Sequence, residues 1–443
     1  MKKSLLWIVV MVLSISMVAA FSFAGCKAAA EAAAAVAEET PSDVVGTLKI
    51  WDMEVDNAFS ASWGFAREEF KAMYPNVTVE YEMKTFEQME QSGKMFLNSA
   101  SVPDVMQCCS GLSRAGMYAS EGLLTDLTAV AEARGWNDIT PPSFQTTCRY
   151  NEQGVMGSGN LYGVTNYGDF VMVYYNKDMF TQYGVEVPTS LAELEAVCDK
   201  FVAEGIVPIT LGGLTGWPIG HVWWELVLYN ADRELINNYF LYTGDVDFQG
   251  EAFASGAEKL AEWATKGYFD PNVNGISYDD ANVAFVQGQT PINITGGWMF
   301  GSFLEKITDF DWGIFLMPGK NLNQGSGGDL WVVPEKAKNK DLAYAYIDLT
   351  LKEEAQTIMA LVGGVPINAD LTQITDQKVL DLNAAFSTIV ANDGMAFYPD
   401  WPVPGYINVL SSNLQELLAG TITPEEFNNA ISIPYNEYKE SRE

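Results

Sequence analysis

Catalytic machinery is sparse in this sequence. His221 is the only histidine among 443 residues. A single histidine excludes His-x-x-x-His zinc sites and every multi-histidine metal cluster. The sequence also contains no Gly-x-x-x-x-Gly-Lys-Ser/Thr phosphate loop and no Gly-x-Gly-x-x-Gly dinucleotide fingerprint. We therefore expect no metal and no ordered cofactor, and a lone histidine such as His221 is more often structural than functional.

One segment resembles a nucleophile elbow. Gly111-Leu112-Ser113-Arg114-Ala115 follows a predicted strand and precedes a predicted helix, which is the setting that such an elbow needs. However, its last position is alanine instead of glycine, and the histidine lies mid-chain instead of near the C-terminus. We predict that Ser113 is not a nucleophile and assign no catalytic residue. Carboxylate pairs suited to glycoside hydrolysis stay open as an alternative, because 57 acidic residues guarantee many pairs.

Aromatic residues are plentiful, with 12 Trp and 20 Tyr. Several tryptophans adjoin Gly, Asp or Pro, or follow such a turn, instead of lying inside apolar strands. The apolar face of a sugar ring stacks on an aromatic plane, while its hydroxyls bond to carboxylates and amides at the rim. This pattern therefore favours carbohydrate binding, although any single tryptophan is more often a core residue. The tryptophans concerned are Trp51, Trp217, Trp223, Trp224, Trp298 and Trp401.

The chain is strongly acidic. It has 25 Lys and Arg against 57 Asp and Glu, a net charge of −32. Such a surface repels nucleic-acid phosphates and anionic lipid heads, so it argues against both as partners and favours neutral or cationic solutes. Hydrophobic residues make up 48% of the chain, which is typical of a globular protein.

The N-terminus has the pattern of an export signal. Lys2 and Lys3 precede an apolar run to Phe23, and Ala24-Gly25-Cys26 follows. This ending resembles the lipobox of bacterial lipoproteins, in which the cysteine receives a diacylglycerol and the chain is cut before it. We predict a signal peptide over 1–25, lipidation of Cys26 and an Ala/Glu-rich tether over 26–45. An uncleaved membrane anchor is the alternative.

Four further cysteines are Cys108, Cys109, Cys148 and Cys198. Cys198 falls on the apolar face of a predicted helix, so we expect it in the core. Cysteines of an exported protein can pair. One disulfide, from Cys108 or Cys109 to Cys148, is therefore a hypothesis.

Strands and helices alternate along the chain. Strands over 47–51, 77–83 and 103–109 are separated by predicted helices, which indicates a mostly parallel α/β sheet with a half-buried strand at 77–83. The pattern restarts after 162. Ser190-Leu191-Ala192-Glu193 is a capping box that opens a helix ending at Gly205, and Thr423-Pro424-Glu425-Glu426 opens a late helix.

Several segments together resemble the family 1 extracellular solute-binding proteins of ABC importers, the group that contains the maltose-binding protein. Leu161-Tyr162-Gly163-Val164 and the following Tyr175-Asn176-Lys177-Asp178-Met179-Phe180 are similar to the family's "LYG" and "YNKDLF" segments. Thr165 stands where the family usually has proline. Ala284-Phe285 through Gly297-Trp298 and the turn Gly363-Gly364-Val365-Pro366 match two later segments. The resemblance runs from about Leu48 to Tyr438.

The resemblance implies an α/β fold of the periplasmic-binding-protein type, with two lobes joined by crossing segments and a ligand cleft between them. We expect lobe 1 over 46–165 and 317–365 and lobe 2 over 166–316 and 366–443. It also implies a set of ligand-contacting residues at strand ends, crossings and loops, with Trp217, His221 and Trp223 expected on a loop after Leu211. These residues are Trp51, Asp52, Ser110, Gly111, Asn166, Tyr167, Asp169, Trp217, His221, Trp223, Trp298, Gly328, Asp329, Trp401 and Tyr406.

The resulting prediction is a monomeric substrate-binding subunit that delivers a mono- or oligosaccharide to ABC permease subunits without chemical change. It is expected outside the cytoplasm, held to the cell membrane by the lipid on Cys26, at the cell surface or in the periplasm. A secreted carbohydrate-active hydrolase and an adhesive surface lipoprotein are the alternatives. The identity of the sugar stays open, as does a polyol or another neutral solute.

Overall fold

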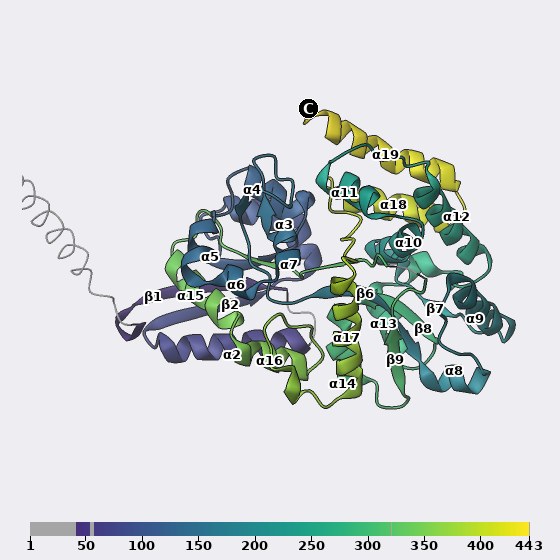
Figure 1. The fold of residues 1–443 in the computed structure, drawn as a ribbon, viewed down its shortest axis with the longest axis horizontal. Coiled ribbons are helices and arrows are strands. Elements are labelled where there is room, and N and C mark those ends of the chain that lie inside the picture. The colour runs from purple at the N-terminus through teal and green to yellow at the C-terminus, as the bar shows by residue number, and fades with distance from the viewer. Residues whose placement is uncertain (1–40, 54–56, 320, 443) are drawn as a thin grey trace, which may run out of the picture. The chain divides into compact units, whose positions relative to one another are not determined.

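The computed structural model describes residues 41–53, 57–319 and 321–442. Residues 41–46 and 73–77 belong to a compact unit of their own, in which Asn76 Nδ2 donates to the carbonyl of Ser42 at 2.8 Å. The rest of the described chain belongs to a larger unit, which holds nearly all of both main sheets (Figure 1). The predicted signal peptide and Cys26 lie outside the described residues, as does most of the predicted tether.

The first sheet has four strands in the order β11-β3-β1-β2. Their bounds are Gly46–Asp52 (β1), Val77–Met83 (β2), Val105–Cys108 (β3) and Leu330–Val332 (β11). β1 and β3 are parallel, with Ile50 opposite Val105, whereas β11 runs antiparallel to β3. The prediction of a half-buried β2 is wrong, because β2 is an edge strand in which only Val77 is buried.

The second sheet has five strands and is mixed instead of mostly parallel. Its order is β10-β6-β8-β7, and β9 also pairs with β6. The strands are Asp169–Asn176 (β6), Ile209–Thr210 (β7), Ile292–Gly296 (β8), Trp312–Phe315 (β9) and Gly325–Ser326 (β10). Strands β7 and β8 are parallel, whereas β6 runs antiparallel to β8, β9 and β10. A small hairpin joins Arg149–Tyr150 (β4) to Asn160–Leu161 (β5).

Helices follow most strands. The α-helices are α2 (Asn57–Met73), α3 (Phe86–Asn98), α4 (Met117–Ser120), α5 (Thr128–Arg134), α6 (Trp136–Ile139), α7 (Pro142–Cys148), α8 (Lys177–Tyr183), α9 (Leu191–Ala203), α10 (Trp217–Leu228), α11 (Arg233–Leu241), α12 (Glu251–Thr265), α13 (Tyr278–Val286), α14 (Phe300–Lys306), α15 (Lys340–Thr350), α16 (Glu353–Leu361), α17 (Gln377–Ala391), α18 (Tyr406–Leu418) and α19 (Pro424–Glu440). Shorter turns of helix are η1 (Pro41–Asp43), η2 (Leu112–Gly116), η3 (Gly213–Thr215), η4 (Val273–Gly275), η5 (Gly297–Met299) and η6 (Leu371–Gln373). None of the helices in the described ranges is long and apolar enough to cross a membrane.

Two predicted helix starts are confirmed by their caps. The Ser190 side chain accepts a hydrogen bond from Glu193 N at the start of α9, and Gly205 follows the end of α9 with a φ of +76°. Thr423 and Glu426 form a reciprocal capping box at the start of α19, with Pro424 in the first turn. Side-chain oxygens at these positions satisfy backbone N–H groups that a helix leaves free.

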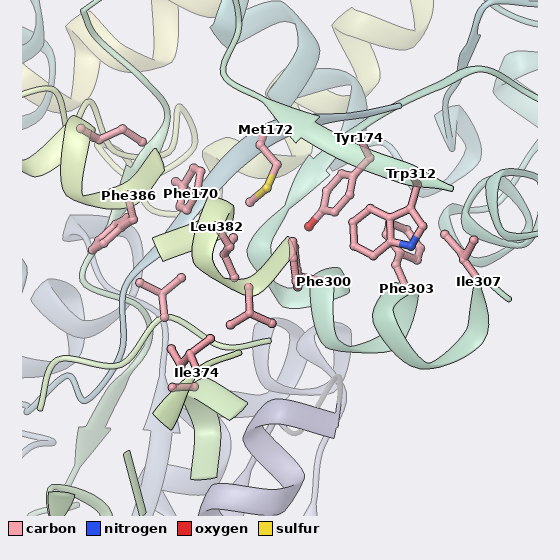
Figure 2. Close-up of a cluster of buried hydrophobic side chains, with 14 of the residues drawn as sticks. Phe170, Met172, Tyr174, Phe300, Phe303, Ile307, Trp312, Ile374, Leu382 and Phe386 are labelled. Atoms are coloured by element: carbon pink, nitrogen blue, oxygen red, sulfur yellow. The ribbon is translucent and has the colours of Figure 1, made fainter. Parts of the chain in front are cut away.

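A hydrophobic core covers one face of the second sheet (Figure 2). Phe170 and Tyr174 of β6 and Trp312 of β9 meet residues of α14 and α17, all buried. Tyr174 lies edge-on to Phe303 at 5.0 Å between ring centroids. Aromatic pairs in this geometry add to the burial of apolar surface.

A second core lies among helices α10, α12, α18 and α19, which pack together (Figure 1). Trp223 and Trp224 of α10 are fully buried there. Trp223 contacts Phe253 and Phe427, and Trp224 donates from Nε1 to the carbonyl of Ala396 at 3.2 Å.

Three segments form a ribbon that connects the two sheets. Residues 164–170 pair antiparallel with 325–331, with Val164 opposite Trp331 and Phe170 opposite Gly325. Tyr167 also pairs with Pro366, and Gly168 N donates to Val365 O at 2.8 Å. Gly168 is required here because a Cβ would lie 2.2 Å from the Phe386 ring. We call residues 164–170, 325–331 and 365–366 the crossing ribbon.

The disulfide hypothesis is wrong. Cys108, Cys109, Cys148 and Cys198 are all free and buried. The thiols make local contacts instead: Cys148 Sγ donates to Phe144 O within α7, and Cys108 Sγ donates to Cys109 O, both at 3.4 Å. Cys198 lies in the core on α9, as predicted.

Candidate functional site

His221 lies among three aromatic rings that come from distant parts of the chain. Its ring centroid is 4.9 Å from Trp217, 5.4 Å from Trp298 and 5.7 Å from Tyr398. Two further rings extend the group, since Tyr278 is 4.5 Å from Trp217 and Trp401 is 5.2 Å from Tyr398. We call these six residues the aromatic cluster.

Helix α10 supplies Trp217 and His221. These two residues and Glu225 recur at a spacing of four, so they share one face of the helix. Trp223 lies on the opposite face, in the helical core. The expected loop is therefore wrong: Trp217, His221 and Trp223 all lie on α10. Eleven of its twelve residues are buried, so its sequence lacks the periodicity that marks an amphipathic helix.

Glycines fix the position of Trp298. The residue follows β8 in the turn η5, and a Cβ on Gly296 would lie 2.0 Å from the Trp298 ring. A Cβ on Gly297 would lie 2.9 Å from Asp169 Oδ1, so the backbone approaches that carboxylate closely. The Trp298 indole donates to the Tyr278 hydroxyl at 2.6 Å, and the same hydroxyl lies 2.8 Å from Thr295 Oγ1. These contacts fix the orientation of the half-buried Trp298 indole.

The segment 397–401 supplies Tyr398 and Trp401. Trp401 stacks on Phe397 at 5.9 Å with an interplanar angle of 22°. The loop after β3 holds this segment, since Ser113 N donates to Trp401 O at 2.8 Å. Gly111, with a φ of +88°, leaves no room for a side chain, because a Cβ would lie 2.6 Å from Trp401. The structure therefore brings Ser110 and Gly111 next to Trp401.

The crossing ribbon carries polar groups, and two of its carboxylates, Asp169 and Asp329, act on the Tyr398 phenol. Asn166 is fully buried, and neither its amide nitrogen nor its amide oxygen has a hydrogen-bond partner in the protein. Tyr167 OH accepts from Asp329 N at 2.9 Å, and a Cβ on Gly328 would lie 2.6 Å from the Tyr167 ring. Buried amides are normally paired. The unpaired amide of Asn166 is therefore suited to bind a ligand group.

Carboxylates and burial shift the pKa values of the groups in the site. Burial lowers the pKa of His221 to about 4, although Asp400 opposes the shift, so the imidazole is neutral at pH 7. Burial raises the pKa of Asp329 above its ordinary value, against hydrogen bonds from the Cys109 and Tyr167 side chains and the charge of Arg114. The pKa of the Tyr398 phenol is also raised, first by burial and then by Asp169, Asp329, the Cys109 thiol and Asp400. Three carboxylates thus act on one phenol.

Four predicted contact residues lie elsewhere. Trp51 packs edge-on against Phe96 at 4.9 Å, and Asp52 accepts from Arg67 and from Tyr81 OH at the end of β1. Trp223 is fully buried in the helical core, and Tyr406 starts α18 and donates to Ile431 O at 2.7 Å. These contacts of the four residues are structural.

Sequence reasoning missed Tyr278, Tyr398 and Arg114. Tyr398 stands three residues before the predicted Trp401. The aromatic residues between Phe397 and Trp401 are a sequence signal for this part of the site. Tyr278 follows the N-cap Ser277, and no sequence motif around it indicates a binding role. Arg114 was considered only as part of the elbow, but its Nη1 donates to Ser113 Oγ at 3.0 Å, so the Ser113 hydroxyl contacts a cation instead of a base. Among the described residues, no group of His, Cys, Asp and Glu could hold a metal ion.

Comparisons with known proteins agree on one family. The family model described as "Bacterial extracellular solute-binding protein" matches residues 54–357. A "Probable sugar-binding periplasmic protein" of Mesorhizobium japonicum is 25% identical over 260 residues, which cover 57% of this chain and 60% of the relative. The chain therefore spans about three fifths of that relative's length. A "Maltooligosaccharide ABC transporter solute-binding lipoprotein" of Streptococcus pneumoniae is 23% identical, covering 72% of this chain and 73% of the relative.

Solved structures share the fold. A protein from a study titled "Biochemical and structural insights into xylan utilization", on the thermophilic bacterium Caldanaerobius polysaccharolyticus, superimposes with a TM-score of 0.76 at 22% identity. It covers 87% of this chain and 98% of its own. A "Chitin oligosaccharide binding protein" gives a TM-score of 0.75 at 21% identity, covering 89% of this chain and 98% of its own.

Proposed function

Because this chain belongs to the family of bacterial extracellular solute-binding proteins, we propose that it binds a mono- or oligosaccharide at the aromatic cluster and delivers it to the permease of an ABC importer. The observation that carries the carbohydrate assignment is the grouping of Trp217, Trp298, Tyr398 and Trp401 around a neutral His221. Aromatic planes with polar groups at their edges suit a sugar ring. The names of the relatives, sugar-binding and maltooligosaccharide-binding, support the same ligand class.

The mechanism would be closure of two lobes on the solute. The sequence predicts that the first lobe resumes at residue 317, but β10 pairs with β6 of the second sheet. We therefore propose the lobes 46–165 with 327–365 and 166–326 with 366–443, linked by the crossing ribbon. A solute that contacts both lobes only in the closed form shifts the population toward that form. Ser110, Gly111 and Asp329 would then contact it from lobe 1, and Trp298 and Trp401 from lobe 2.

Binding without chemical change is the second part of the proposal. The Ser113 hydroxyl faces Arg114, and the pKa of about 4 of His221 reflects an apolar setting among aromatic rings. A hydrolase would leave shorter sugars after long incubation with an oligosaccharide. Recovery of the intact ligand supports the receptor, and a product would favour the hydrolase.

Anchoring to the membrane through Cys26, after cleavage of residues 1–25, completes the proposal. It is supported by the sequence pattern and by the relatives that are named lipoproteins. Mass spectrometry of the mature N-terminal peptide tests it, since a diacylglyceryl group on Cys26 adds a defined mass.

Titration calorimetry of the purified full-length protein against a panel of mono- and oligosaccharides tests the ligand class. Saturable binding is expected, with a loss of about tenfold or more in affinity for Trp298→Ala, because the stacking plane is removed. Trp312→Phe is the matched control, since Trp312 lies in the hydrophobic core with Tyr174 and should leave affinity unchanged. A cooperatively folded protein that binds none of the sugars would contradict the assignment.

A further inference from the structure

Arg114 is a buried cation whose donors are already occupied. Its guanidinium is paired with Glu90 of α3 through two nitrogens, Nε to Oε1 and Nη2 to Oε2, the latter at 2.8 Å. Nη1 lies 2.7 Å from Asp400 Oδ2 and also donates to Ser113 Oγ at 3.0 Å. Only 6% of the Arg114 side chain is exposed. A guanidinium carries five N–H donors, so two carboxylates and a hydroxyl leave it little capacity for another anion.

Asp400 joins this ion-pair group to the aromatic cluster. It directly precedes Trp401, and its charge acts on both the His221 imidazole and the Tyr398 phenol. The ion pair between Asp400 and Arg114 therefore lies at the edge of the cluster. Without Asp400, a carboxylate of the ligand could pair with Arg114 at this place. Arg114 is the cation that its contacts with Asp400 and Ser113 place at this edge.

Among the described residues, the other charges that act on the cluster come from carboxylates. Asp169 Oδ1 lies against the turn at Gly297, and Asp329 sits beside Tyr167 in the crossing ribbon. The Tyr398 hydroxyl is buried and has no hydrogen-bond partner in the protein, which marks it as a donor for a ligand. A ligand at this hydroxyl would lie near carboxylates, and like charges at such distances repel strongly in a partly buried site.

We propose that Asp400 acts as an internal carboxylate that occupies Arg114, so that the aromatic cluster accepts neutral and amino sugars and rejects sugars that carry a carboxylate or a phosphate. Asp400 is thereby a specificity-determining residue. This inference rests on the proposed sugar-binding function. Arginine pairs with carboxylates and phosphates in the same bidentate geometry, so both kinds of acidic sugar are affected.

The test compares three sugars that differ at one substituent and in charge, by titration calorimetry of the full-length protein at low salt. They are a neutral sugar that binds, its uronic acid and its 2-amino counterpart. In the wild-type protein the acid should bind at least about tenfold more weakly than the neutral sugar, and the amino sugar at least as tightly. This comparison requires no variant, so it can overturn the proposal even if a substitution prevents folding.

Two variants with the same change in net charge sharpen the test. Asp400→Asn removes the carboxylate on the cluster side of Arg114 and should raise the affinity for the uronic acid, relative to the neutral sugar, by about tenfold. Glu90→Gln removes the carboxylate on the α3 side and should not raise that ratio.

The outcomes separate the two proposals. Equal or tighter binding of the uronic acid by the wild type overturns the inference while sugar binding stands. An unchanged ratio in a folded Asp400→Asn protein, or the same rise in Glu90→Gln, also overturns it, because net charge alone would then explain the preference. If no sugar of any charge binds, the proposed function itself fails and the inference fails with it.

Discussion

The indole of Trp298 and the phenol of Tyr278 are joined by a hydrogen bond of 2.6 Å from Nε1 to the hydroxyl oxygen. The same oxygen lies 2.8 Å from Thr295 Oγ1, so the phenol connects the turn η5 to strand β8. A turn tied in this way holds the Trp298 plane before a ligand arrives, and such preorganisation raises affinity.

Tyr278→Phe should lower the free energy of unfolding by about 1–3 kcal/mol, because it leaves the Trp298 N–H without its acceptor. Urea denaturation measures this change. Tyr183→Phe is the control, since this half-buried ring packs on Phe201 at the surface of α8 and should change stability by less than about 0.5 kcal/mol. Equal losses in both variants would contradict a special role for Tyr278.

His221 should make stability dependent on pH. Its pKa of about 4 in the folded state lies below the ordinary histidine value of 6.5, so the unfolded state binds the proton more readily. Stability is therefore unaffected by this group above pH 6.5 and falls as the pH drops toward 4, with a loss of about 2 kcal/mol at pH 5. Urea denaturation at pH 7 and pH 5 measures the loss, and His221→Gln should reduce the difference by that amount. An equal pH dependence in the variant would show that other groups cause it.

Gly168→Ala should destabilise the protein by about 1–3 kcal/mol, because the new methyl group would lie 2.2 Å from the Phe386 ring and overpack the crossing ribbon. Gly64→Ala in helix α2 is the matched control. Its Cβ would have only an ordinary contact, 3.7 Å from Arg67, and alanine favours the helix by about 0.5–1 kcal/mol. Thermal unfolding of the two variants should move in opposite directions.

A substitution of Asp52 can distinguish a structural role of this residue from a role in ligand binding. Its side chain is fully buried and accepts from Arg67 at 3.1 Å and from Tyr81 OH at 2.9 Å. Asp52→Asn should lower the free energy of unfolding by about 1–3 kcal/mol, because the buried Arg67 loses the negative charge of Asp52. Affinity for the sugar should be retained. A loss of affinity at unchanged stability would instead support the ligand contact predicted from the sequence.

The parts of the fold that could be predicted are those encoded locally. The N-cap Ser190 and the capping box at Thr423 start α9 and α19 where expected, since a cap depends on neighbours three residues away. Trp298 was singled out because two glycines precede it. Helix α10 was missed because it is buried on nearly every side, and the turn-like Gly216 and Pro218 at its start suggested a loop.

The parts that could not be predicted depend on contacts between distant segments. Tyr278 becomes part of the candidate site only because its helix start faces Trp217 and Trp298. Arg114 and Asp400 are 286 positions apart in the sequence, and nothing local to either residue indicates the pair. The disulfide hypothesis failed for a related reason, because the presence of cysteines does not determine where their side chains point.

The two faces of helix α10 have different roles, one in the helical core and one in the aromatic cluster. Trp223 and Trp224 pack this helix into the helical core, whereas Trp217 and His221 belong to the aromatic cluster. The other cluster residues come from the turn after β8, the start of α13 and the segment 398–401, none of which forms part of a sheet interior. Solute preference can therefore drift during evolution through exchanges in these short segments, while the two sheets and the orientation of α10 are inherited unchanged.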